Sequence, residues 1–247
     1  MPPPSPLRRA FGAALLLLLA AGCAADRLDR AKASLEEGQT FARRGEFGNA
    51  RRALVRAEGT ADALAARGDE IGRQALIVRG VARLERARLI EAGADDPRSA
   101  ALVGDAAADL ACAAAAAAED PPGAAFEAPL LPLALGALHL EEARLALGRL
   151  SGGPDGGRAG EAGLRAFRTA RGLYENAAEL AKDEKSPRHL AAARERGLLA
   201  LALEGEFQRR WAGILESGPA PDSANACYTR ADEAFRAAVA FAADHAG

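Results

Sequence analysis

The side chains that could carry out chemistry are sparse, since the 247 residues include only three histidines and three cysteines. His139 and Glu142 share one helix face at i, i+3, and their nitrogen and oxygen atoms are both zinc ligands. No second pair of this kind and no His-Glu-x-x-His pattern accompanies them. We therefore predict no metal and no cofactor, with His139 as a surface or packing residue.

A glycine-rich segment at 152–157, Gly-Gly-Pro-Asp-Gly-Gly, has the composition of a phosphate-binding loop. It lacks the Gly-Lys-[Ser/Thr] ending, contains a proline and follows a predicted helix instead of a strand. We predict a flexible loop.

The best candidate for an enzymatic residue is Glu216, which Ser217 follows. Lytic transglycosylases, which are helical envelope enzymes, place their acid glutamate in such a dipeptide, and the resemblance implies that Glu216 would protonate a glycosidic oxygen. That family's Gly-Leu-Met-Gln segment is missing; residues 218–221, Gly-Pro-Ala-Pro, follow as at a helix end. We predict no catalytic residue, with a peptidoglycan-acting enzyme as the alternative.

Cys23 lies at the end of a secretory-signal pattern. Arg8 and Arg9 precede an apolar run at 11–21, and small residues then lead to the cysteine. The run is shorter than the roughly 20 residues that a membrane-spanning helix needs. We therefore expect residues 1–22 to be removed as a signal peptide.

The segment Leu19-Ala20-Ala21-Gly22-Cys23 resembles the lipobox of bacterial lipoproteins, although that family prefers leucine where Ala20 stands. The resemblance implies cleavage before Cys23, a diacylglycerol on its thiol and a further acyl chain, such as palmitate, on its amine. Two or more acyl chains anchor a protein stably in a bilayer. Ala24, in place of aspartate, implies the outer membrane facing the periplasm, with the inner membrane as the alternative.

Cys112 and Cys227 remain once Cys23 is lipidated. An oxidising envelope would permit a disulfide between them. Cys112, however, lies in an alanine run, where cysteine behaves as a small buried apolar residue. The sequence leaves the bridge open.

The charge of the chain excludes one class of partner. Its formal net charge is −2, and loss of Arg8 and Arg9 with the signal makes it more acidic by two charges. Nucleic-acid binders usually carry a basic face, so we exclude nucleic acid. Arg43-Arg44 and Arg51-Arg52 are local basic pairs near the anchor in sequence, where lipid headgroups are conceivable contacts.

The composition predicts an all-α fold, because alanine, leucine, arginine and glutamate dominate and strand formers are scarce. Glycine and proline mark the connections between periodic segments. After a short tether at 23–27, the domain at 28–247 is predicted to contain helices at 28–44, 47–67, 69–93, 98–119, 128–150, 159–183, 187–216 and 222–245.

Paired in order, these helices make about four antiparallel hairpins, and the first resembles a tetratricopeptide repeat. The residues that carry the resemblance are Gly38, Phe41, Gly45, Ala50, Leu54 and Ala57. Ser34, Glu37 and Asp62 depart from the family's tryptophan, leucine and proline. Small Gly38 and Ala50 are predicted to lie where the two helices approach most closely, beside Phe41 and Leu54.

The later hairpins keep fragments of this pattern. In the second we predict packing by Gly80 and by alanines 107, 111 and 114; in the third by Gly136 and Ala170-x3-Tyr174; in the fourth by Gly197 and Ala231-x3-Phe235. Stacked hairpins of this kind form a curved array with a concave binding face.

These features predict a non-enzymatic membrane-anchored lipoprotein that acts as a protein–protein interaction scaffold for unidentified envelope proteins. Two alternatives stay open: the peptidoglycan-acting enzyme with Glu216, and a ligand-binding helical-repeat component of a solute transport system.

Overall fold

The computed structural model describes residues 6–90, 96–119, 128–150, 154–218 and 221–244, and every regular element within these ranges is an α-helix. The all-α prediction is confirmed. The helices are α1 (Pro6–Arg43), α2 (Phe47–Ala65), α3 (Glu70–Arg88), α4 (Pro97–Glu119), α5 (Leu130–Gly148), α6 (Pro154–Asp183), α7 (Pro187–Glu216) and α8 (Pro221–Asp244).

Three boundaries differ clearly from the sequence expectation. The helix predicted at 69–93 ends at Arg88, as α3. Residues 23–27, predicted as a tether, belong to α1, and Ala24 is buried in the core together with Leu28. The segment 152–157 was predicted as a loop, but α6 already begins at Pro154; residues 151–153 lie outside the described ranges. Proline suits a first helical turn because its missing N–H is not needed there.

Short-range chemistry explains several helix ends. Gly45 has φ 76° and makes the turn between α1 and α2, a backbone conformation that glycine adopts without steric cost. At the start of α3, the Asp69 side chain accepts a hydrogen bond from the Gly72 backbone N–H at 3.0 Å. Pro187 begins α7 directly after Ser186. Gly45 and Pro187 therefore mark helix ends, as the sequence predicts.

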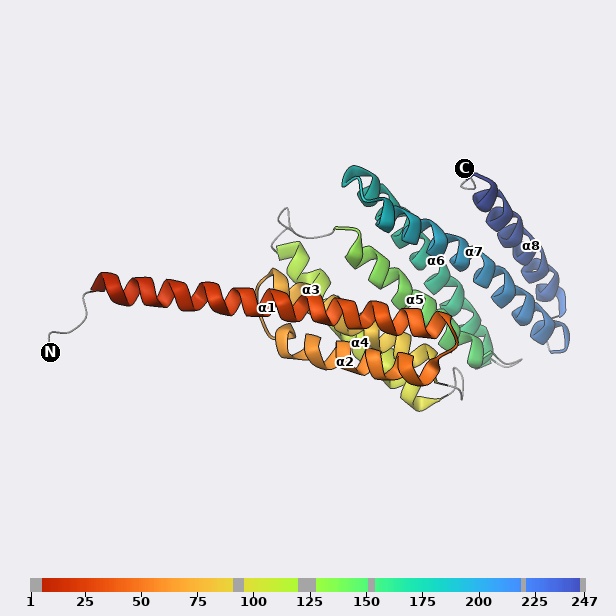
Figure 1. The fold of residues 1–247 in the computed structure, drawn as a ribbon. Helices are drawn as coiled ribbons and strands as arrows, with labels where there is room; N and C mark the ends of the chain where they lie inside the picture. Colours follow the sequence, from red (N-terminus) through yellow and green to blue (C-terminus); the bar gives the residue numbers. More distant parts are fainter. Residues whose placement is uncertain (1–5, 91–95, 120–127, 151–153, 219–220, 245–247) are drawn as a thin grey trace.

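The helices pack in two layers (Figure 1). Each helix packs on the next one along the chain, and each odd-numbered helix also contacts the next odd-numbered helix, so that α1, α3, α5 and α7 form an inner layer. Among the described residues, the even-numbered helices do not contact one another. Figure 1 also shows the N-terminal part of α1 projecting beyond the other helices.

Three hydrophobic clusters form the core, and each joins a hairpin to the first helix of the next hairpin. The first lies among α1, α2 and α3, the second among α3, α4 and α5, and the third among α5, α6 and α7. Because every odd-numbered helix from α3 to α7 takes part in such a junction, burial of apolar surface runs continuously along the array.

Within each hairpin, a glycine of the odd-numbered helix lies against a large side chain of the even-numbered helix. A Cβ on Gly38 would stand 2.8 Å from Leu54, one on Gly80 3.0 Å from Leu110, one on Gly136 2.5 Å from Tyr174 and one on Gly205 2.8 Å from Phe235. The helix axes therefore approach too closely for any larger residue at these positions.

This geometry corrects two predicted contacts. In the fourth hairpin the glycine against Phe235 is Gly205, whereas a Cβ on Gly197 would have Phe241 as its nearest neighbour, at 3.7 Å. In the second hairpin the buried residues are Ala106, Leu110 and Ala113, one position before the predicted alanines 107, 111 and 114. All four hairpins thus share an Ala-x3-large-x2-Ala pattern on the second helix.

Candidate functional site

The inner layer lines a partly open cavity of about 270 Å³. Its lining comes from all four odd-numbered helices: from the last third of α1 and mostly from the first half of α3, α5 and α7. The apolar side chains are Leu35 of α1, Ile77, Val78 and Val81 of α3, Leu130, Leu133 and Ala134 of α5, and Ala192 of α7. Residues separated by more than 150 positions in the sequence thus share one site.

Polar side chains complete the lining. They are Lys32, Glu36 and Gln39 of α1, Gln74 of α3, and Arg188, His189 and Arg196 of α7. Arg188 forms an ion pair with Glu36, which links the last inner helix to the first. Both side chains are largely exposed, at 75% and 55%, so the pair contributes little to stability, but it bridges the inner face.

A chain of hydrogen bonds crosses the inner layer next to the cavity. Gln39 Nε2 donates to Glu85 Oε1 at 3.2 Å, and Arg88 pairs with both Glu85 and Glu141. Arg144 approaches the same Glu141 carboxylate at 2.6 Å. The Glu141 side chain is 5% exposed, and two guanidinium groups satisfy its buried charge. These residues hold α1, α3 and α5 in register.

The Tyr174 hydroxyl is one of the buried polar groups without a hydrogen-bond partner within the described ranges. Tyr174 is 1% exposed and its oxygen has no hydrogen-bond partner in the described structure. Burial raises the pKa of the phenol, and the positive charges of Arg196 and Arg88 oppose this effect. Tyr174 therefore stays neutral, and Arg196, which lines the cavity, is one of its electrostatic neighbours.

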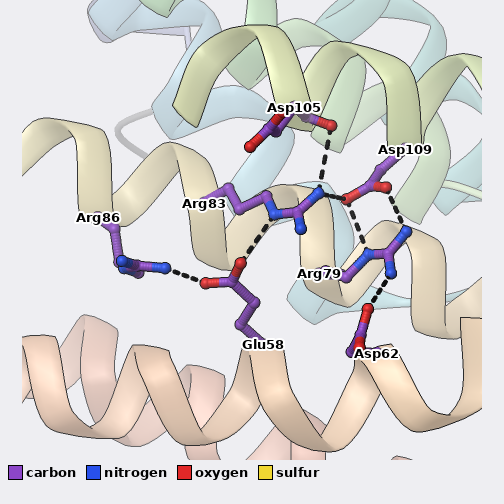
Figure 2. A network of polar contacts seen from close by, with 7 residues as sticks. All are labelled: Glu58, Asp62, Arg79, Arg83, Arg86, Asp105 and Asp109. Carbon is purple, nitrogen blue, oxygen red and sulfur yellow. Dashed lines mark hydrogen bonds and ion pairs between the residues drawn. The ribbon is translucent and has the colours of Figure 1, made fainter. Parts of the chain in front are cut away.

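A separate polar network joins the first two hairpins on the other side of α3 (Figure 2). Its members are Glu58 and Asp62 of α2, Arg79, Arg83 and Arg86 of α3, and Asp105 and Asp109 of α4. The Asp109 carboxylate, 5% exposed, accepts from Arg79 at 2.6 Å and from Arg83 at 2.8 Å. Arg79 also forms an ion pair with Asp62 of α2, and Arg83 forms one with Glu58 of α2. Ion pairs therefore connect α3 to both α2 and α4.

Cys23 lies in α1 with its thiol free and exposed. The basic pair Arg43-Arg44 lies at the other end of the same helix, about 30 Å away at 1.5 Å per residue. Arg51-Arg52 lies near the start of α2, which follows the C-terminal end of α1, so this pair is also far from Cys23. Closeness to the anchor in sequence is therefore not closeness in space, and these arginines do not surround Cys23.

The two residues considered for chemistry lie apart from the cavity. His139 Nδ1 lies 2.6 Å from Glu142 Oε2, and within the described ranges no group of three potential ligands forms around them. Glu216 is exposed at the end of α7 and accepts a hydrogen bond from the Tyr228 hydroxyl at 3.0 Å. Neither residue lines the cavity.

Cys112 and Cys227 do not form a disulfide, since both thiols are free. The expectation that Cys112 is buried is wrong, because it lies on the solvent side of α4. Cys227 is buried in α8, and burial raises the pKa of its thiol.

The residues proposed to pack the first hairpin lie at the contact between α1 and α2. Ala50, Leu54 and Ala57 are fully buried, and Gly38 faces Leu54. Phe41 is half-buried near the end of α1.

Sequence reasoning missed the cavity residues, because each helix contributes only a few of them. Inward-facing small and aliphatic residues on α5 and α7, such as Ala134 and Ala192, resemble any other core positions. The one available signal was that Lys32, Arg188 and Arg196 occur on first helices of hairpins, which alone does not place them together.

No protein-family model matches the chain, and no curated protein shows significant similarity to it. Among the described residues, one helix, α4, is long and apolar enough to cross a membrane by length and composition. Core helices of soluble proteins pass the same test, and α4 packs through Leu110 against Gly80 of α3.

Proposed function

We propose that this protein is a lipid-anchored lipoprotein of the bacterial envelope whose helical body binds a small ligand, as a component of a solute transport system. The cavity lined by α1, α3, α5 and α7 carries the proposal. At about 270 Å³ it is near the small end of the range of ligand pockets. A partner helix, about 10–12 Å across with its side chains, does not fit such a space.

The membrane anchor rests on the lipobox resemblance and is supported by the position of Cys23. Cleavage before Cys23 would make it the first residue of α1, with an exposed thiol and with Ala24 already in the core. The acyl chains would then join the body without a flexible linker.

Native mass spectrometry of the protein purified from membranes tests the binding role. We expect a small-molecule adduct on the wild type. Val81→Trp fills the cavity and should remove the adduct, whereas Val55→Trp, at a 48% exposed position of α2, should keep it. An adduct-free wild type, or an adduct that survives Val81→Trp, would count against the proposal.

A scaffold role is the second candidate, and exposed apolar side chains at the last hairpin favour it. They are Leu199 and Leu203 of α7 and Phe235 and Val239 of α8, with exposed fractions between 36% and 71%. Among the described helices, α8 contacts only α7, so no other described helix covers its outer face. A photocrosslinking residue at Val239 should capture an envelope protein that the same residue at Val55 does not; equal capture at both would oppose this role.

A further inference from the structure

The cavity lining carries more positive than negative charge. Lys32, Arg188 and Arg196 are its cations, and Glu36 is the carboxylate among them. Glu36 is already engaged by Arg188. Within the described ranges no ion pair joins a carboxylate to Lys32 of α1 or to Arg196 of α7, so the lining has an excess of positive charge.

The direction of the inner helices adds to this positive potential. α5 begins at Leu130 and α7 at Pro187, and cavity residues occupy the first turn of both helices. The N-terminal end of a helix carries about half a positive charge, because its first N–H groups have no partner within the helix. The first turns of α5 and α7 and the cationic side chains therefore all border the cavity, with Arg196 lying nine residues beyond the start of α7.

Apart from Gln39, Gln74 and His189, the remaining lining is apolar. Leu35, Ile77, Val81, Leu130 and Leu133 offer aliphatic contact from three helices. A volume of about 270 Å³ corresponds to about nine water molecules at roughly 30 Å³ each. This space suits a short aliphatic body and excludes a long lipid or a polymer.

From this lining we infer that the cavity takes a small amphipathic organic anion, with the anionic head between Lys32 and Arg196 and the aliphatic body against α3 and α5. The inference rests on the proposed binding role of the cavity and adds the chemical class of the ligand. Charge complementarity selects the anion over a neutral or cationic molecule of the same length.

Isothermal titration with three probes of equal length tests the inference: hexanoate, 1-hexanol and hexylammonium. The mature lipoprotein is held in nanodiscs, and empty nanodiscs give the blank. We expect saturable one-to-one binding of hexanoate, at least about tenfold tighter than that of hexylammonium.

Matched double variants locate the anionic head. Lys32→Gln with Arg196→Gln should weaken hexanoate binding by about tenfold or more, because two charged partners are lost. Lys182→Gln with Arg194→Gln removes the same charge from the groove lined by α6, α7 and α8, and should change the affinity by less than about twofold. Circular dichroism melts verify that both double variants fold.

The opposite outcomes are equally distinct. Equal or tighter binding of hexylammonium, or an unchanged affinity in the Lys32 and Arg196 variant, overturns the anion assignment and leaves the binding role standing. If hexanoate gives no saturable heat but the native adduct described above is present, the anion assignment alone is overturned. If that adduct is also absent, both the anion assignment and the proposed binding role are overturned.

Discussion

Gly136 of α5 and Tyr174 of α6 lie in such close contact that a Cβ on the glycine would stand 2.5 Å from Tyr174 Cε1. The same relationship recurs in the other hairpins, with leucine in the first two and an aromatic ring in the last two. Close helix approach is thus produced locally within each hairpin.

Gly136→Ala should lower the free energy of unfolding by about 1–3 kcal/mol, because the buried Tyr174 ring has no space to yield. Urea denaturation measures the change. The control is Gly172→Ala on α6, where a Cβ would meet nothing within 4 Å. There alanine should stabilise the helix by about 0.5–1 kcal/mol. The same sign for both substitutions would contradict the close-contact explanation.

Glu141→Gln should also destabilise the protein, by about 1–3 kcal/mol, because Arg88 and Arg144 lose their shared charged partner. Its sequence neighbour gives the control. The Glu142 side chain is 42% exposed and contacts His139, so Glu142→Gln should change stability by less than about 0.5 kcal/mol. Thermal unfolding of both variants measures the difference. An equal loss of stability in the two variants would rule out a special role for the Glu141 carboxylate.

The helix pattern was predictable because local chemistry determines it. Gly45, Asp69 and Pro187 end or begin helices for reasons contained within a few residues. The buried face of α4 was not predictable in this way, because an Ala-x3-Ala pattern can be placed at several positions along the alanine run. Only Leu110 identifies which residues of the run are buried.

The cavity could not be predicted for a different reason. Lys32 and Arg196 face one space only after three helix-to-helix rotations have been fixed. Each rotation depends on close contacts such as Gly80 against Leu110, and an error in any one would remove the site.

Asp69 makes the start of α3 sensitive to acid. Its hydrogen bond from Arg67 lowers the pKa of the carboxyl below its ordinary value of 3.8, burial opposes this, and the Gly72 N–H lowers it further. A lowered folded-state pKa means that the stabilisation is complete above pH 3.8 and is lost as the pH falls through the folded-state pKa.

Asp69→Ala should therefore cost about 1 kcal/mol at pH 7 and little once the wild-type carboxyl is protonated. Chemical denaturation of both proteins between neutral and acidic pH measures this difference. The control is Asp232→Ala, at an exposed position of α8, measured over the same pH range. A gap for Asp69→Ala that persists at the lowest pH would disprove the capping explanation.

Cys23→Ser should move the protein out of the membrane fraction or leave its signal uncleaved, because the acylated sulfur is lost. Cell fractionation and metabolic labelling with palmitate give the readout. Cys112→Ser is the matched control, since that thiol is also exposed but lies in α4. Unchanged acylation of Cys23→Ser would refute the lipoprotein proposal.

The cavity draws on α1, α3, α5 and α7 at once, whereas each core cluster involves only three successive helices. Hairpin arrays lose structure piecemeal, since each unit depends on its neighbours alone. A bound molecule would contact the first and the last inner helices together, which are otherwise joined by the exposed Arg188–Glu36 pair, and would stabilise both by mass action. Ligand binding would thus replace the stepwise unfolding of separate hairpins by one cooperative transition. A narrower thermal unfolding transition would then indicate that ligand is bound.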